Sequence, residues 1–145
     1  MIIYSLCFLL MNNQMVKSQE DVVSEFHAIQ HKENEQIFIE TYKNKSIDAQ
    51  AYVLALEMKK AEYTILPWKK LDIFNTKKKE LNALIAKYPE NIHLRYMRLY
   101  LQENTPKILG YTTNIKEDKA FLKKKLETED PSDYMDTYIK QNTSL

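Results

Sequence analysis

Two arginines on one predicted helix are the residues of this chain whose chemistry stands out. Of the 21 basic residues only Arg95 and Arg98 are arginines, and the rest are lysines. A guanidinium group is planar, holds a carboxylate through two hydrogen bonds and tolerates partial burial better than an ammonium group does. The two arginines lie three residues apart on a mostly apolar helix, so we expect both guanidinium groups at the edge of the core.

Two interpretations of this pair follow from its chemistry. In the first, which we favour, the guanidinium groups form structural ion pairs with acidic residues of neighbouring helices, and the candidates are Asp118, Glu57 and Glu62. In the second, they hold an anionic ligand or the carboxylate of a partner in a groove beside Tyr96 and Tyr100. The first interpretation gives the arginines a role in stability and the second gives them a role in binding.

Two histidines offer a weaker candidate site. His27 and His31 are four residues apart, which would place both on one face of a helix and could provide two metal ligands. A third ligand would be needed, and Glu35 is one turn further along. Because the chain contains no HExxH motif, we expect two surface histidines rather than a metal site.

Local signatures of catalysis are absent from the sequence. It has a single glycine, so it has no glycine-rich phosphate loop, and it has no nucleophile elbow. Its ten tyrosines are typical of the edge of a core or of an interface. We therefore expect a protein that acts by binding rather than by catalysis and that needs no cofactor.

The first eleven residues, MIIYSLCFLLM, form an apolar run interrupted only by Ser5. The run is too short to cross a bilayer and has the length of the apolar region of a signal peptide. The small-residue pattern at residues 16–18 predicts cleavage before Gln19. We thus predict a signal peptide over residues 1–18, a single domain over residues 19–145, and a periplasmic or secreted location. The alternative is a buried N-terminal helix in a cytoplasmic protein.

Cleavage at this point would change the chemistry of the remaining chain. Cys7 would be removed, which leaves no thiol for a disulfide, for catalysis or for metal binding. Lys17 would also be lost, so acidic and basic residues would balance. Nucleic-acid binding needs a basic excess, and we therefore expect a protein partner and no nucleic acid. We expect no stable membrane span in the mature chain.

Composition and periodicity predict an all-α fold. The chain has one glycine and four prolines, too few for the many turns of a sheet protein. Apolar residues recur at helical spacing along most of its length. We expect six or seven helices, in antiparallel hairpins, over residues 20–31, 35–42, 48–63, 67–88, 92–104, 115–127 and beyond 131.

Prolines and polar caps set the expected helix boundaries. Pro89 ends one helix and Asn91 caps the next, while Pro67 suits a first helical turn. Asp48 is a further candidate cap. Residues 114–117 have the spacing of a capping box, and residues 130–131 suggest a cap followed by proline.

The hairpins on either side of residues 88–91 resemble tetratricopeptide repeats, without a clear 34-residue period. They predict a short α-solenoid or an irregular bundle. A further resemblance covers roughly Ile47 to Leu126, and it lies in the segments AY at 51–52, AEY at 61–63, PWKKL at 67–71, LRYMRL at 94–99, QENTP at 102–106, LGY at 109–111 and NIKEDK at 114–119. Together they resemble a family of small exported helical proteins of Bacteroidetes-type bacteria. This resemblance implies a fold and a compartment, and implies no activity.

Two functional hypotheses remain. The first is an exported, non-catalytic protein-interaction module. The second is a small-ligand carrier or an enzyme with an anion-binding site near Arg95, Arg98 and the loop at 105–113. Guanidinium groups already paired with Asp118 or Glu57 would favour the first hypothesis, and guanidinium groups pointing into an empty pocket would favour the second.

Overall fold

A computed structural model describes residues 19–145, and all the regular secondary structure in this range is helical. The predicted all-α fold is therefore confirmed. The predicted signal peptide, residues 1–18, lies outside the described residues.

The chain is helical from residue 19, the first described, to residue 27. Six α-helices and three short 3₁₀ segments follow: α2 Lys32–Tyr42, α3 Ile47–Lys59, η1 Lys60–Tyr63, α4 Pro67–Lys87, α5 Ile92–Asn104, η2 Lys107–Leu109, α6 Ile115–Leu126, η3 Asp133–Met135 and α7 Asp136–Asn142.

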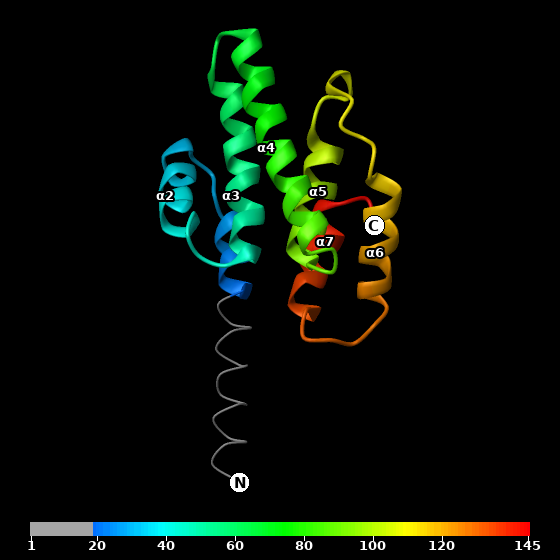
Figure 1. Cartoon of the computed structure of the whole chain (residues 1–145). Helices are drawn as coiled ribbons and strands as arrows, with labels where there is room; N and C mark the ends of the chain where they lie inside the picture. The colour runs from blue at the N-terminus through cyan, green and yellow to red at the C-terminus, as the bar shows by residue number, and fades with distance from the viewer. Residues whose placement is uncertain (1–18) are drawn as a thin grey trace.

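Helices α3 and α5 form the centre of the molecule. Helix α3 packs against α2, α4 and α5, and α5 packs against α3, α4 and α6 (Figure 1). Tyr52 on α3 and Tyr96 on α5 are fully buried, as are Leu94, Met97 and Leu99. Both helices are buried on nearly every side because neighbours cover them all round, which explains why apolar residues occupy most of their positions.

Successive helices run in opposite directions. The α3–α4 hairpin turns at one end of the molecule, the α4–α5 turn lies at the other end, and the chain returns through η2 to α6 (Figure 1). We call the end that carries the α3–α4 turn and η2 the loop end. Gly110 follows η2 with a φ of +62°, a left-handed conformation that favours glycine and lets the chain reverse there.

Several predicted boundaries are confirmed, and one cap was assigned to the wrong residue. The side chain of Asn91 accepts a hydrogen bond from the Leu94 N–H at 3.0 Å, and Pro67 occupies the first turn of α4. Ser46, and not Asp48, caps α3, because its hydroxyl accepts from the Ala49 N–H at 3.2 Å. Asp48 lies in the first helical turn instead, where its charge favours the helix dipole.

Other parts of the prediction differ from the structure. Helix α2 begins at Lys32 rather than at residue 35. The first helix stops at residue 27, four residues early. Asn114 is the cap residue of α6, but its side chain donates to Glu117 and accepts nothing from the helix, so the capping box does not form. Helix α7 begins at Asp136 rather than after Pro131. Asp130 accepts hydrogen bonds from both the N–H and the hydroxyl of Ser132, and this local turn competes with a helical start.

Candidate functional site

The two arginines lie in a buried ionic cluster between α5 and α6. The Arg98 Nε and Nη2 donate to the two carboxylate oxygens of Asp118, at 2.6 and 2.7 Å. The Arg95 Nη1 reaches the same carboxylate at 2.9 Å and also donates to Glu117. We call these four residues the polar seam.

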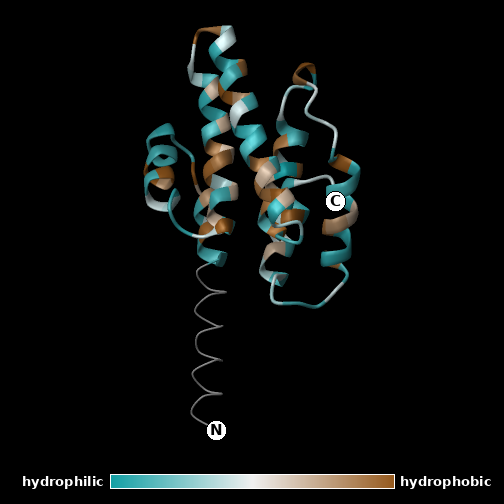
Figure 2. Ribbon diagram, viewed as in Figure 1, coloured by the Kyte–Doolittle hydropathy of each residue, from teal (hydrophilic) through white to brown (hydrophobic). Residues whose placement is uncertain are grey.

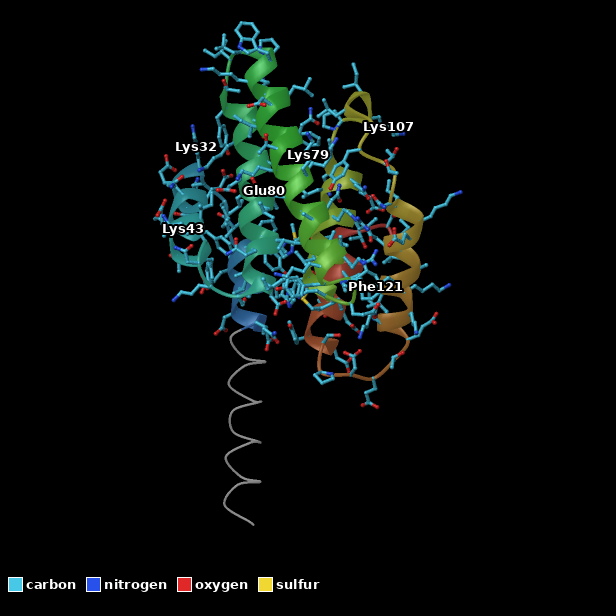
Figure 3. All side chains as sticks on the ribbon, in the orientation of Figure 1. Lys32, Lys43, Lys79, Glu80, Lys107 and Phe121 are labelled. Carbon is cyan, nitrogen blue, oxygen red and sulfur yellow. The ribbon has the colours of Figure 1, made fainter. Side chains whose placement is uncertain are left out.

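The polar seam has no room for a ligand. Asp118 is fully buried, and Arg95 and Arg98 are only 8% and 4% exposed, respectively. The Arg95 Nε donates to the Pro89 carbonyl oxygen at 3.0 Å, and its guanidinium group lies 5.3 Å from the ring centre of Phe121, which faces the bundle from α6 (Figure 3). The hydrogen bond from Arg95 lowers the pKa of Glu117. This arrangement is that of structural ion pairs, in which each charge is already balanced.

The two tyrosines proposed to flank an anion site do not lie beside the arginines. Tyr96 and Tyr100 are on the opposite face of α5, and the Tyr96 hydroxyl contacts the His27 Nε2 at 2.7 Å. The predicted groove that combined arginines and tyrosines is therefore absent from the described structure. Of the other acidic candidates, Glu57 pairs with Lys77 at 3.0 Å and Glu62 contacts neither arginine.

The histidine pair is also separated. His27 ends the first helix and stacks on the Tyr138 ring at 5.4 Å, whereas His31 is the cap residue of α2. They do not share a helix, so the placement of both on one helix face, predicted from their spacing, was wrong. Glu35 instead accepts from Lys59 and Tyr63. Within residues 19–145, no group of three or more His, Cys, Asp or Glu side chains is placed to hold a metal ion.

A buried hydrogen-bonded network surrounds His93 and was not predicted from the sequence. The Tyr52 hydroxyl lies 2.6 Å from His93 Nδ1, and the Tyr134 hydroxyl lies 2.7 Å from its Nε2. Burial lowers the pKa of His93 to about 4, although Asp48, 4.0 Å away, acts in the opposite direction. A neutral imidazole with a hydroxyl at each nitrogen is fully hydrogen-bonded, so the network is structural. The only signal for it was a histidine among apolar residues at the start of a capped helix.

An open groove lies at the loop end of the described residues. Its volume is about 670 Å³, and its walls come from the first helix, α3 and η1, the start of α4, the end of α5 and η2. Ala55 and Ala61 lie on its walls, where their small side chains leave space. Its apolar lining includes Phe26, Ile29, Met58, Leu71, Phe74, Leu101 and Leu109.

Polar groups line this groove as well as apolar ones, and the uncharged polar residues and histidine among them are His27, Tyr100, Asn104 and Thr105. Lys59, Glu62 and Lys70 contribute to its lining, and Lys59 is already paired with Glu35 at 2.6 Å. No ion pair involves Glu62 or Lys70 within the described chain. The groove is thus mostly apolar, with one charge of each sign that forms no ion pair in the described chain, and it was not predicted from the sequence.

Comparison of the chain with protein-family models, with curated proteins and with solved structures gave no match. The resemblance to exported helical proteins therefore stays a prediction. Among the helices in residues 19–145, none combines the length and apolar character needed to cross a membrane.

Proposed function

We propose that the protein is an exported, non-catalytic interaction module that binds an amphipathic helix of a partner protein in the groove at the loop end. The observation that carries the proposal is the groove itself, an apolar cavity of about 670 Å³ that is open to solvent. A concave, mostly apolar cavity of this volume with a few polar groups is the usual form of a binding site.

A helix suits the groove better than an extended peptide does. The walls are side chains of helices, and no sheet edge exists in the described residues to which an extended strand could add. Ala55 and Ala61 allow another helix to come close, and apolar residues at helical spacing would fill the space between α4 and α5. This arrangement agrees with a tetratricopeptide-like stack of hairpins, in which ligands lie along a groove formed by several helices.

The charges at the groove define the partner further. Glu62 and Lys70 are both exposed and take part in no ion pair within residues 19–145. A polypeptide can present a basic and an acidic side chain to these two residues while its apolar stripe enters the groove. We expect such charges to set the orientation of the helix more than its affinity.

A small-ligand carrier is the second candidate, because the volume of the groove falls in the range of small-molecule sites, about 300–1,000 Å³. Its ligand would be apolar. An anionic ligand has no free guanidinium group to bind near the arginines, because the Asp118 carboxylate already forms ion pairs with both of them.

Photo-crosslinking in the native host tests these proposals. A benzophenone amino acid replaces Leu71, which lines the groove and is 50% exposed. The matched control carries the same group at Ile37, which is 63% exposed on α2 and lies outside the groove. We expect a crosslinked protein of defined mass from position 71 and none from position 37.

The crosslinked segment then provides a synthetic peptide for titration. It should become helical on binding, and L71D should weaken its affinity at least about tenfold while I37D leaves it unchanged. An adduct with a small molecule at position 71 would support the carrier instead. Equal crosslinking from both positions, or none from position 71, would contradict both proposals.

A further inference from the structure

We propose that the loop end also docks on the surface of an anionic lipid bilayer. Two separate connections present apolar side chains there: Ile65 and Trp68 flank the start of α4, and Ile108 lies in η2. In Figure 2 the apolar colour marks both tips at this end of the molecule. Residues next to both tips, Pro67 and Leu109 among them, line the same groove.

These side chains project into water and are not walls of the groove. Ile65 and Ile108 are each 93% exposed and Trp68 is 67% exposed, and none of the three lines the cavity. A helix bound in the groove would therefore leave them uncovered. Isolated exposed apolar residues are ordinary, but two almost fully exposed isoleucines and the only tryptophan of the chain at one end form a surface that needs its own partner.

The surrounding charges favour lipid headgroups. Lys69 and Lys107 directly adjoin the exposed apolar residues, and Lys107 lies at the same end in Figure 3. Neither takes part in an ion pair within residues 19–145. Including Lys70, the lysines here outnumber the nearby acids Glu62 and Asp72, although charge over the whole chain almost balances. Lysines near an anionic leaflet contribute to binding, and tryptophan prefers the interface between headgroups and acyl chains.

The start of α4 adds to this preference. No side chain caps the first turn of this 21-residue helix, whose N–H groups carry the positive end of its dipole toward the same surface. A second copy of the chain fits less well as the occupant, because two loop ends placed face to face would bring lysines together. The apolar tips would enter the bilayer interface while lysines and free N–H groups contact phosphates.

The single tryptophan gives a direct test with the full chain. We expect Trp68 emission to shift to shorter wavelength, and brominated lipid to quench it, when vesicles of phosphatidylglycerol are added. Vesicles of phosphatidylcholine alone should produce a much smaller shift, and high salt should weaken the response. Because Trp68 lies at the loop end, its emission reports the contact of this end with the vesicle.

Matched variants separate the apolar and charged contributions. The I65D/I108D double variant should lower vesicle partitioning by at least about tenfold, because it removes two apolar anchors. K69E/K107E should lower it by about tenfold or more on anionic vesicles only. The controls are I37D on α2 and K123E/K124E on the exposed side of α6. Neither should change the partitioning of the protein onto vesicles.

Unchanged Trp68 emission on anionic vesicles would overturn the proposal, as would an equal response on both lipids. A shift that grows with protein concentration without vesicles would identify a second copy as the occupant and overturn it as well. Neither result bears on the groove, whose test at position 71 can succeed or fail independently.

Discussion

The polar seam and the groove lie on α5 at different faces, and they differ in almost every physical property. In the seam, two guanidinium groups and the Asp118 carboxylate are packed between α5 and α6, with Glu117 at the exposed edge, and Asp118 has no exposed surface. In the groove, mostly apolar side chains line about 670 Å³ of open space, and Glu62 and Lys70 are its charged residues without an ion pair in the described chain. In the seam, each charged group is already paired within the chain. The groove instead has apolar surface that only a partner can cover.

This contrast shows that the residues whose types stand out in the sequence are not the residues that are free to bind a partner. Arginines attract attention in a lysine-rich chain because they recognise anions, but here the anion is supplied by Asp118 of the same chain. The available surface is made of leucine, alanine and aromatic residues that look like ordinary core. We therefore expect substitutions in the seam to alter stability and substitutions in the groove to alter binding.

The largest effect should come from Asp118→Ala. It leaves two guanidinium groups buried without their shared carboxylate, and breaking a buried ion pair in this way costs about 3–5 kcal/mol in the free energy of unfolding. Urea denaturation measures this quantity. Glu117→Ala is the control, because Glu117 is 55% exposed at its side chain and should cost less than about 1 kcal/mol. Similar losses for the two variants would show that the seam is not a buried structural unit.

Acidic pH should lower the free energy of unfolding through the buried hydrogen-bonded network around His93. The pKa of His93 is about 4 in the folded state, against about 6.5 for an unperturbed histidine. As the pH falls, the unfolded chain therefore protonates this histidine at a higher pH than the folded chain does. The stabilisation from the neutral His93 is fully present above pH 6.5 and is lost as the pH falls toward 4. The loss should approach roughly 3 kcal/mol. Burial also lowers the pKa of His27, which acts in the same direction.

Denaturation curves recorded from pH 7 to pH 4.5 measure this loss before most carboxylates titrate. His93→Gln removes the titrating group and keeps a neutral side chain that can hydrogen-bond to the Tyr52 and Tyr134 hydroxyls. It should flatten the pH dependence. A wild-type free energy of unfolding that stays constant over this interval would contradict the assignment of a buried neutral imidazole.

A smaller loss is expected for Arg98→Lys. The ammonium group keeps the charge but loses the two parallel hydrogen bonds to Asp118 and the contact with Asn82 at 3.3 Å. We expect a decrease of about 1–2 kcal/mol in the free energy of unfolding and a lower melting temperature. A melting temperature equal to that of the wild type would count against a structural role for this arginine.

The smallest effect on stability should come from the groove. Leu71→Asp changes a half-exposed residue, so the free energy of unfolding should shift by no more than about 0.5 kcal/mol while partner binding is lost. Calorimetry of the variant measures the stability. A loss of several kcal/mol would mean that the groove is part of the core and would remove the contrast between the two regions.

The sequence predicted the elements well where it contains strong local signals. Both ends of α5 were predicted because Pro89 and Asn91 precede it and Pro106 follows it. The early end of the first helix was not predicted, since residues 28–31 contain neither proline nor glycine. The start of α7 was misplaced because Asp130 makes a local turn that its sequence context does not distinguish from a helix cap.

Prediction of the site succeeded only where the chemistry of a side chain limits the residues with which it can pair. An arginine at the edge of a core needs a carboxylate, and Asp118 was among three candidates that the sequence offered. The groove could not be predicted in the same way, because its walls come from four separated stretches of the sequence and its alanines are equally suited to any packed helix. The His93 network depends on hydroxyls of Tyr52 and Tyr134, each 41 residues away.

Crosslinking from two positions in the same host cells tests the central contrast most directly. One protein carries the benzophenone group at position 71 in the groove, and the other carries it at position 117, the exposed edge of the polar seam. We predict a defined adduct with a partner protein from position 71 and none from position 117. An adduct from position 117 and none from position 71 would contradict the account, because it would place recognition at the arginines.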